Sequence, residues 1–300
     1  MGNDSGTIVI ESNEIQISNP DKLLFKNPGI RKADMLAYYI KASNEMLPFL
    51  KGRPVTLIRY PDGIDAHSFY QKHLPGHAPG FIKKPFAEKE NIEDIPIVCD
   101  DLSTMLWLVN LAAVEFHVPF QRLGESNPRE IVLDLDPPSR RDFSLAVEAA
   151  LIVRDLSERL GLDSYVKTSG NKGLQVYFPL PDCSITYRDT KKFLDFTASY
   201  LIEQEPDWFT VERLKKKRGR KLYLDVVQHA EGKTIIAPYS LRGNEEGLCA
   251  TPLFWEEVTK GLDPEMYTMD EALRRLEAKQ PFAGFFDEKN ERIKEIIKAL

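Results

Sequence analysis

The sequence has few cysteines and no long apolar run. Its 300 residues contain three cysteines, Cys99, Cys183 and Cys249, which are scattered and form no C-x-x-C pair. We therefore expect neither a disulfide framework nor a cysteine zinc site, and a reducing compartment fits. No stretch approaches the roughly 18 consecutive apolar residues of a membrane span, and the first residues lack the basic and apolar regions of a secretory signal. These absences predict a cytoplasmic protein with no membrane partner.

Two common phosphate-binding fingerprints are also missing. The chain contains neither G-x-x-x-x-G-K-[ST] nor G-x-G-x-x-G, which argues against a Walker A loop and a dinucleotide-binding turn. Hydrophobic residues make up 42% of the chain, enough for a core, so a disordered chain is excluded. Because single cores stop growing at roughly 250 to 300 residues, we expect one catalytic domain over residues 1–300.

Charge is unevenly distributed along the chain. The 40 basic and 46 acidic residues give a net charge of −6, yet residues 215–221 read KKKRGRK and carry +6, which leaves −12 for the rest. Such a run is either a solvated loop or a contact for a polyanion. The acidic total therefore does not exclude a nucleic-acid partner.

Helix-like and strand-like patterns alternate from end to end, which indicates an α/β or α+β fold. Apolar residues at three- and four-residue spacing predict helices, and short or alternating apolar runs predict strands. The predicted helices are 33–50, 103–116, 144–160 with Gly161 as its stop, 188–203, and a helical closing segment from residue 269. The predicted strands are 7–17, 55–60, 131–136, 165–168, 174–178, 222–227 and 234–239.

Two aspartates share one face of a predicted strand. In IVLDLD, residues 131–136, the alternation places Asp134 and Asp136 on one face and the apolar residues on the other. Carboxylates about 6.6 Å apart, at roughly 3.3 Å per residue, repel each other unless a cation lies between them. Such an all-oxygen site suits Mg²⁺ or Mn²⁺. The alternative is that both carboxylates simply face water at a strand end.

A third aspartate favours the metal interpretation. In KLYLDVV, residues 221–227, Leu222, Leu224 and Val226 point one way and Asp225 points the other. If the two strands are neighbours, three carboxylates converge, as a two-metal site for phosphoryl transfer requires.

Three further features are weak when taken singly. The turn KTSGNKG, residues 167–173, offers an anion its backbone amides, the Ser169 hydroxyl and the Lys172 charge, although an ordinary hairpin turn explains it equally well. Arg242, after a predicted strand, has the donor geometry to clamp a triphosphate, yet alone it reads as a surface residue. His117 lies at the end of an apolar helical stretch before a proline, where a lone histidine is usually structural.

Read in order, six strings resemble one protein family. They are GRPVTLIRYPDGID, SFYQKH, VEFHVPF, IVLDLDPP, KTSGNKGLQVYF and APYSLR, between SNPDKLLF near residue 18 and TPLFWEEV near residue 258. Together they resemble the polymerase domain of prokaryotic DNA ligase D, in the archaeo-eukaryotic primase superfamily. The resemblance implies an α+β fold with a primase-like catalytic core, whose RRM-like antiparallel sheet packs against a second α/β layer.

The same resemblance implies a template-directed nucleotidyltransferase that fills gaps and extends ends in non-homologous end joining. Its expected cofactors are two Mn²⁺ or Mg²⁺ ions, and its substrates are NTPs or dNTPs and DNA ends or gaps with a 5′-phosphate. The adenylation motif K-x-D-G is missing from these residues. We therefore expect the polymerase to stand alone in this chain, with Ku and a separate DNA ligase as partners.

Roles carry over position by position. The resemblance implies that Asp134, Asp136 and Asp225 are catalytic metal ligands, with Asp225 also placed to help deprotonate the primer 3′-hydroxyl. It assigns the nucleotide to His117, Ser169, Lys172 and Arg242, and the DNA or nucleotide to Arg218. It assigns the DNA 5′-phosphate to Asn19, Lys22 and Lys32, and template stacking to Phe69 and Tyr70. Strand alternation would instead turn one of the two aromatic rings inward.

One position departs from the pattern of many relatives. They have histidine after KGL in the nucleotide loop, and this chain has Gln175. Glutamine keeps a hydrogen-bond donor but cannot become cationic, so its place in the nucleotide site implies a different triphosphate affinity or metal preference.

Three other functions remain open from the sequence. A non-catalytic DNA-end-binding module would keep the phosphate pocket without turnover. A metal-dependent glycosyltransferase also uses D-x-D, but does not explain the third aspartate. A haloacid-dehalogenase-type phosphatase would want Thr or Val where this chain has Pro138.

Overall fold

The computed structural model describes residues 5–85, 95–278, 280–288 and 290–300. The chain divides into two compact units. The first comprises Met1–Pro119, Ile236–Cys249 and Thr268–Ala278, and the second comprises Phe120–Ile235, Ala250–Tyr267 and Lys279–Leu300. The expectation of one catalytic domain over residues 1–300 stays a prediction.

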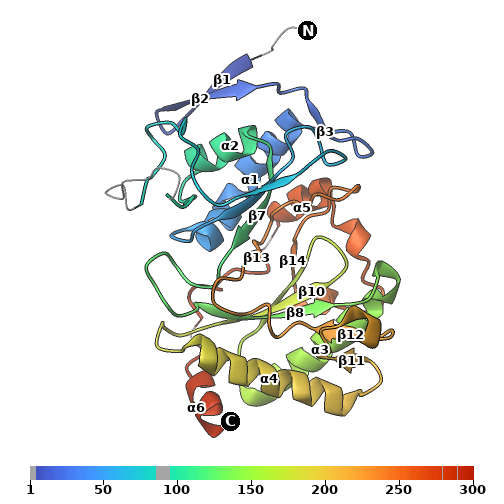
Figure 1. The fold of residues 1–300 in the computed structure, drawn as a ribbon. Coiled ribbons are helices and arrows are strands. Elements are labelled where there is room, and N and C mark those ends of the chain that lie inside the picture. The colour runs from blue at the N-terminus through green and yellow to red at the C-terminus, as the bar shows by residue number, and fades with distance from the viewer. Residues whose placement is uncertain (1–4, 86–94, 279, 289) are drawn as a thin grey trace. The chain divides into compact units, whose positions relative to one another are not determined.

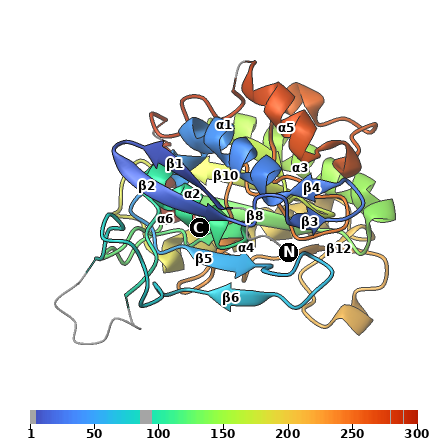
Figure 2. The ribbon, with the colours of Figure 1, turned by 90° about the horizontal axis from the view of Figure 1, so that it is seen from above.

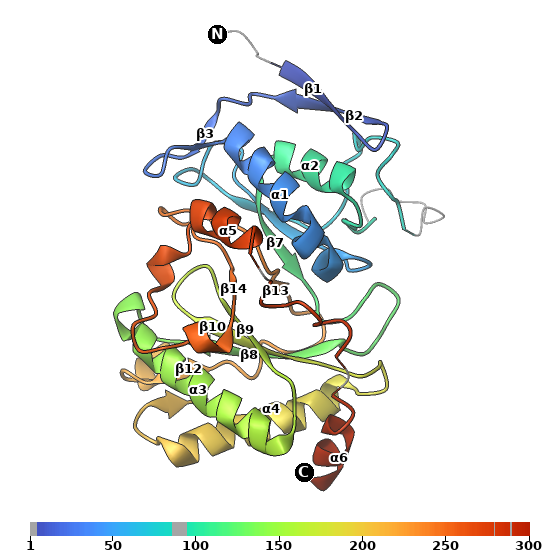
Figure 3. The ribbon, with the colours of Figure 1, turned by 180° about the vertical axis from the view of Figure 1, so that it is seen from behind.

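The first unit contains an antiparallel sheet of strand order β13-β7-β5-β6 and two neighbouring helices, α1 and α2 (Figure 3). Figure 2 shows β5 and β6 side by side. The elements of this sheet and its helices are β5 (Thr56–Arg59), β6 (Phe69–Gln71), β7 (Ala113–Val118), β13 (Ile235–Ile236), α1 (Lys32–Leu50), α2 (Leu102–Asn110) and α5 (Met269–Leu276). Two small hairpins complete the unit: β1 (Ser5–Ile10) with β2 (Asn13–Ser18), and β3 (Leu23–Phe25) with β4 (Ile30–Arg31).

Hydrogen bonds hold helix α1 at its start and in its middle. At its start Asp34 accepts a hydrogen bond of 2.8 Å from the backbone amide of Arg31, which satisfies one of the free donors there. In its middle the buried Tyr39 donates a hydrogen bond of 2.7 Å to the carbonyl of Val114 in β7. The helix and the central strand of the sheet are thereby fixed to each other.

The predicted strand 7–17 is a hairpin rather than one strand. Glu11 and Ser12 adopt φ angles of 49° and 70°, in the left-handed region. Two such residues in succession form the tight turn that reverses an antiparallel pair, so β1 and β2 lie side by side with Ile8 opposite Ile15.

The predicted helix 103–116 is wrong in its second half. Helix α2 ends at Asn110, Ala112 takes a φ of 61°, and the chain then forms β7. His117 therefore lies in a strand, opposite Thr56 of β5, and not at the end of a helix. The β-branched and aromatic residues Val114 and Phe116 favour a strand because they pack well on a pleated surface.

The second unit is built on a six-stranded sheet of order β11-β12-β8-β10-β9-β14, antiparallel except for the pair β11 and β12. Its strands are β8 (Glu130–Asp136), β9 (Tyr165–Thr168), β10 (Leu174–Pro179), β11 (Phe209–Thr210), β12 (Leu222–Leu224) and β14 (Pro252–Leu253). Its helices are α3 (Phe143–Leu160), α4 (Tyr187–Gln204) and α6 (Ile293–Ala299). Figure 1 shows α3 and α4 together on one side of β8 and β10.

The face of this sheet that meets α3 and α4 is apolar. Ile131, Leu133 and Leu135 of β8 are fully buried there in one core with Ala146 of α3 and Phe193 of α4. Because strand residues alternate between faces, Asp134 and Asp136 project from the opposite face. The core therefore sets the direction in which the aspartates point.

The observed ends of helices and strands differ from the predicted ends mainly where the chain turns. Helix α3 ends at Gly161, whose φ of 66° stops it as expected. Strand β12 ends at Leu224, three residues before the predicted end, because the amide of Gln228 bonds back to Asp225 in a turn. The predicted strand 234–239 shortens to β13, and the closing segment forms α5 and α6 with turns between them.

No helix in the described part of the chain is both long and apolar enough to cross a membrane.

Candidate active site

The predicted site residues fall in both units, and each unit is described by itself. The second unit holds Asp134, Asp136, Ser169, Lys172, Gln175, Arg218 and Asp225, and the first holds Asn19, Lys22, Lys32, Phe69, Tyr70, His117 and Arg242.

Four polar residues form one row across four strands of the second unit. Asp134 of β8 pairs with Gln175 of β10, and Gln175 pairs in turn with Lys167 of β9. On the other side the backbone amide of Asp225, just after β12, donates a bond of 3.1 Å to the Asp134 carbonyl. Residues directly opposite each other in neighbouring strands project from the same face. The sheet thus brings Asp225 beside Asp134, although they are far apart in the sequence.

Within this row, the surroundings of Asp134 disfavour its ionised form. Its side chain accepts a hydrogen bond of 3.0 Å from Nε2 of Gln175. Burial, with the charges of Asp136 and Asp225, raises the pKa of Asp134 to about 6, although the Gln175 bond and the Lys167 charge act in the opposite direction. The charges of Asp136 and Asp225 therefore act against the ionised form of Asp134.

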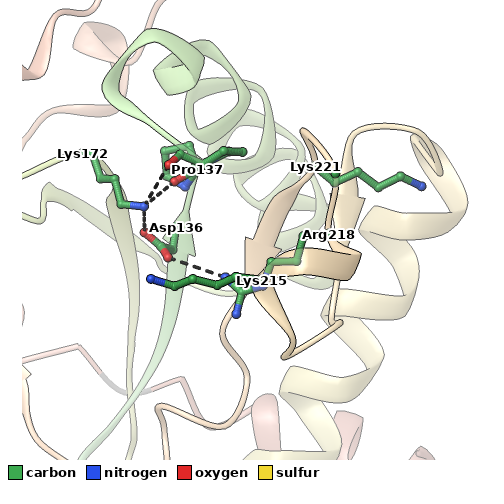
Figure 4. A pocket seen from close by; sticks show the side chains of 8 residues that line it. Asp136, Pro137, Lys172, Lys215, Arg218 and Lys221 are labelled. Carbon is green, nitrogen blue, oxygen red and sulfur yellow. Dashed lines mark hydrogen bonds and ion pairs between the residues drawn. The ribbon is translucent and has the colours of Figure 1, made fainter.

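Asp136 stands at the edge of a small basic pocket of about 140 Å³ (Figure 4). Lys172 lies 3.0 Å from one of its oxygens, and Nη1 of Arg218 lies 4.0 Å from the other. Lys215 also lines the pocket, whereas Lys221 lines it but turns its ammonium group away, to the carbonyl of Pro206 at 2.7 Å. The pocket joins cations from two segments around one carboxylate, an arrangement suited to an anion such as a phosphate.

Asp225 is held by its own turn. It accepts hydrogen bonds of 3.1 Å from the Tyr223 hydroxyl and from the Gln228 amide. Burial and the Asp225 charge raise the pKa of Tyr223 to about 12, so the phenol remains a donor. The guanidinium of Arg218 lies 3.6 Å from the centre of the Tyr223 ring, which links the basic run to this aspartate.

The three aspartates have the ligand chemistry that a divalent metal requires, but at present their side chains contact other residues. Among the described residues no three His, Cys, Asp or Glu side chains are arranged to hold a metal ion. Asp136 is paired with Lys172, and Asp225 is held by Tyr223, so an ion would have to replace these contacts. The fit is visible at Gln175, whose buried Oε1 has no hydrogen-bond partner among the described residues and lies next to Asp134. A buried amide oxygen beside a carboxylate offers two oxygen ligands to a hard cation.

The loop before β10 depends on two glycines. Gly170 adopts a φ of 70°, and a Cβ on Gly173 would lie 2.3 Å from the carbonyl oxygen of Leu135 in β8. The Ser169 hydroxyl accepts hydrogen bonds from the amides of Asn171, at 3.3 Å, and Gly173, at 3.1 Å. The loop is thus folded tightly against β8, and it places Lys172 beside Asp136.

Lys167 is a functional candidate that the sequence analysis missed. Its side chain is fully buried, its Nζ donates to the carbonyl of Thr168 at 3.2 Å, and its charge acts on Asp134. A buried lysine is rare unless its charge is used or compensated. The signal that could have found it is the strand register, which sets Lys167 level with Gln175.

In the first unit a second missed residue, Glu115, gathers two predicted nucleotide ligands. Its carboxylate lies 2.8 Å from Nε2 of His117 and 3.0 Å from Nη1 of Arg242. Burial alone would raise the pKa of Glu115, but the bond from His117 and the charge of Arg242 outweigh it and lower that pKa to about 2. Glu115 is therefore ionised and brings His117 and Arg242 to one point.

The three predicted 5′-phosphate ligands lie at the start of α1. The amide of Lys22 bonds to the carbonyl of Asn19 at 3.1 Å, and the amide of Lys32 bonds to the carbonyl of Lys22 at 2.9 Å. Lys32 is the first residue of α1, whose amino-terminal end attracts anions. The structure thus brings Asn19, Lys22 and Lys32 together.

The two lysines differ in their surroundings. Lys22 pairs with Asp62 at 2.8 Å, whereas the Lys32 ammonium is buried and donates to the carbonyls of Ser18, at 2.6 Å, and Asn110, at 2.9 Å. Burial, and then the charges of Lys22 and Arg59, lower the pKa of Lys32 to about 8. An arriving phosphate would relieve this repulsion.

Both aromatic residues of β6 are accessible. Phe69 is 37% exposed and Tyr70 is 71% exposed, so neither ring packs into the core. Arg59, which the sequence analysis did not single out, lies over Phe69 at 4.9 Å from the ring centre and also bonds to Gln71. The stacking role of the two rings stays a prediction.

Comparison with known proteins identifies the class. The structure superposes on the "Polymerase Domain from Mycobacterium tuberculosis Ligase D in complex with DNA" with a TM-score of 0.82 and 30% sequence identity, over 92% of this chain and 99% of that one. The predicted α+β, primase-like fold is thereby confirmed.

Residues 31–282 match the family described as LigD, primase-polymerase domain. The chain belongs to this family, which implies nucleotidyltransferase activity. It is 47% identical, over 91% of its length, to the "Bifunctional non-homologous end joining protein LigD" of Bacillus subtilis (strain 168). It is 35% identical, over 88% of its length, to the "Multifunctional non-homologous end joining protein LigD" of Mycolicibacterium smegmatis. The chain spans 44% of the first relative's length and 35% of the second's.

Proposed function

We propose that this chain is a template-directed polymerase that fills gaps and extends DNA ends during non-homologous end joining, using NTPs or dNTPs. The pairing of Asp134 with Asp225 carries the proposal, because the neighbouring strands β12 and β8 set Asp225 beside Asp134 on the face of the sheet opposite α3 and α4. Membership in the primase-polymerase family supports the reaction class, and the names of the relatives support the repair pathway.

The reaction joins the primer 3′-oxygen to the α-phosphate of the nucleotide. The O–P bond forms in line with the bond that breaks, and pyrophosphate leaves with the bonding electron pair. Asp225 helps to take the hydroxyl proton. Asp134, Asp136 and Asp225 would hold two Mn²⁺ or Mg²⁺ ions, which would neutralise charge on the reacting phosphate and acidify the hydroxyl.

The other site residues position the substrates. Ser169, Lys172 and Gln175 bind the nucleotide through charge-assisted hydrogen bonds, and His117 and Arg242 are further nucleotide ligands in the proposal. Arg218 contacts DNA or the nucleotide from the basic run, and the pocket around Asp136 supports this.

The residues at the start of α1 bind the DNA strand on the far side of a gap. Asn19, Lys22 and Lys32 bind the 5′-phosphate of the downstream strand, because two ammonium groups and a helix terminus stabilise a doubly charged anion. Phe69 and Tyr70 stack on template bases, a contact that any base accepts. Ku and a DNA ligase activity are the proposed partners, and the cytoplasm is the proposed location.

Primer extension on a gapped, 5′-phosphorylated template with Mn²⁺ tests the proposal. We expect Asp134→Ala with Asp136→Ala to lower the rate by at least about a hundredfold, because both remove transition-state charge stabilisation. The matched control, Asp155→Ala with Asp195→Ala, removes two half-exposed carboxylates elsewhere in the unit and should keep the wild-type rate. Equal rates in both double variants would refute the catalytic assignment.

The same assay distinguishes a polymerase from a non-catalytic DNA-end-binding module. A wild-type chain that binds the gapped DNA tightly, but never extends the primer with any nucleotide, is a binding module without turnover.

A further inference from the structure

Glu115, a buried carboxylate of the first unit, is not one of the three aspartates, and the proposed reaction assigns it no role. Glu115 is in β7, between Val114 and Phe116, and is 5% exposed. An ionised carboxylate is rarely buried unless several donors compensate it. Its donors therefore indicate what it does.

Four donors converge on Glu115. Oε2 lies 2.8 Å from Nε2 of His117 and 3.0 Å from Nη1 of Arg242. Oε1 accepts from the Tyr60 hydroxyl at 3.2 Å and from the amide of Gly243 at 3.0 Å. These donors come from three separate segments of the chain, so the carboxylate joins the ends of β5 and β7 to the segment that follows β13.

The surroundings leave Glu115 little freedom. A Cβ on Gly243 would lie 2.2 Å from atoms of the Tyr60 ring, so the ring packs directly on the glycine backbone. The amide of Phe116 donates to the Ser240 hydroxyl at 2.9 Å, and the amide of Ala237 donates to the Phe116 carbonyl at 2.9 Å. The segment that carries Arg242 is thus fastened to β7 at Phe116, the residue next to Glu115.

Chemistry fixes the tautomer of His117. An ionised carboxylate only accepts hydrogen bonds, so the proton of the shared bond belongs to Nε2 of His117. The other ring nitrogen, Nδ1, then carries a lone pair in the neutral ring and a proton in the cationic ring. The further titratable groups that face the carboxylate are Tyr60, Tyr39 of α1 and the cationic Arg242.

We propose that Glu115 is a positioning residue for the nucleotide: it fixes the Nε2–H tautomer of His117, favours the cationic ring, and sets the guanidinium of Arg242 beside it. The inference rests on the proposed function, because it is the assignment of His117 and Arg242 to the nucleotide that gives the arrangement its purpose. A sugar and a triphosphate are recognised by donors in fixed positions, and Glu115 fixes two of them without touching the substrate.

NMR of the wild-type chain tests the first part without any enzymatic activity. The chain has five histidines, so the His117 signals can be assigned by their loss in His117→Gln. We expect ¹⁵N shifts of the Nε2–H tautomer for the neutral ring of His117, above the pH at which it titrates. In Glu115→Gln, which keeps the size and an acceptor oxygen, the ring should titrate about one pH unit lower, because a neighbouring carboxylate favours the charged ring. An Nδ1–H tautomer in the wild type, or an unchanged titration in the variant, would overturn the proposal.

Kinetics test the second part. Glu115→Gln should raise the KM for the nucleotide at least tenfold, with a smaller effect on kcat, and should leave binding to 5′-phosphorylated DNA unchanged as a check of the fold. Glu14→Gln, at an exposed position of β2, is the matched control and should behave as wild type. In the background of Arg242→Gln the further loss from Glu115→Gln should shrink to less than threefold, since the two act as one unit. Additive losses would show that Glu115 does not act through Arg242.

The two proposals fail separately. If the aspartate double variant still extends primers, the proposed polymerase function fails. If that variant is inactive but Glu115→Gln has wild-type KM and titration, only the role of Glu115 fails.

Discussion

Asp134 is placed where an ionised carboxylate is costly. Two other aspartates lie near it, its side chain is partly buried, and its pKa is raised to about 6. Between the unfolded value of about 3.9 and this value the folded chain binds more protons than the unfolded chain. This residue therefore lowers the free energy of unfolding as the pH rises through that window, and its cost is complete above pH 6.

We predict that Asp134→Asn stabilises the metal-free chain at pH 8. The expected gain in the free energy of unfolding is about 2 kcal/mol, less than the full shift because solvent screens a partly buried group. The gain should vanish below about pH 3, where the wild-type carboxyl is protonated in both states. Urea unfolding in a chelating buffer at the two pH values measures it. Asp155→Asn on the exposed surface of α3 is the control, and a destabilised Asp134→Asn at pH 8 would contradict the prediction.

The lysines at the start of α1 should control the preference for phosphorylated ends. Lys22→Ala with Lys32→Met removes both charges while methionine fills the buried position of Lys32. Because charge-assisted hydrogen bonds contribute about 1.5 to 3 kcal/mol each, we expect the preference for a 5′-phosphorylated gap over an unphosphorylated one to fall at least tenfold. Fluorescence anisotropy with the two DNAs measures it.

Lys26→Ala is the control, since this lysine is 71% exposed and forms an ion pair of 2.8 Å with Asp65. The wild-type preference should also decline as the pH rises above 8, because Lys32 then loses its proton. A preference that is constant from pH 7 to 9.5 would contradict the role of Lys32.

At the scale of elements, the loop between β9 and β10 is fitted to β8 at the backbone. We predict that Gly173→Ala destabilises the chain by about 2 kcal/mol, because overpacking against the Leu135 carbonyl forces the loop outward. The same displacement should move Lys172 from Asp136 and raise the nucleotide KM. Thermal unfolding and primer extension measure the two effects.

Gly80→Ala is the control, since nothing lies within 4 Å of the added carbon. Wild-type stability of Gly173→Ala would show that the loop relaxes freely and that its glycine is not required by β8.

The sequence predicted those elements whose pattern is long and regular. The helices α1, α3 and α4 and strand β9 were found within a residue or so, because their apolar spacing repeats over several turns or matches a short alternating run. It failed at β7, where a strand follows α2 after two residues and apolar residues continue on both sides of Asn110. There a single left-handed residue, Ala112, separates helix from strand, and no glycine marks it.

The candidate site was predictable in the same uneven way. Alternation placed Asp134 and Asp136 on one face, and the register confirms that Asp225 lies beside Asp134. Glu115, Lys167 and Arg59 were missed because a charged residue within an apolar strand does not reveal its partners. Those partners come from segments distant in the sequence, so only the folded chain brings them together.

At the scale of the whole molecule, the acidic total hides a basic region. The run KKKRGRK includes the 3₁₀ turn Lys215–Lys217, whose three lysines are exposed. Each phosphate contact lowers the slope of log affinity against log salt by about 0.9. We therefore predict a steep loss of DNA affinity with salt despite a net charge of −6.

Lys216→Gln with Lys217→Gln should make that slope shallower by about 1 to 2, measured by DNA binding from 50 to 300 mM salt. The matched control is Lys191→Gln with Lys192→Gln on α4, which changes the net charge equally. If both pairs change the slope alike, net charge rather than the basic run governs binding.

The row that joins Asp225, Asp134, Gln175 and Lys167 also constrains how such chains can diverge. Gln175 lies between Asp134 and the buried Lys167, and its side-chain amide donates one hydrogen bond, to Asp134. A histidine there would bring a second ionisable base next to Lys167, and two like charges in a dry interior repel. The row therefore couples any change at Gln175 to the charges of both Asp134 and Lys167, and substitutions at these three positions should have non-additive effects on stability and activity.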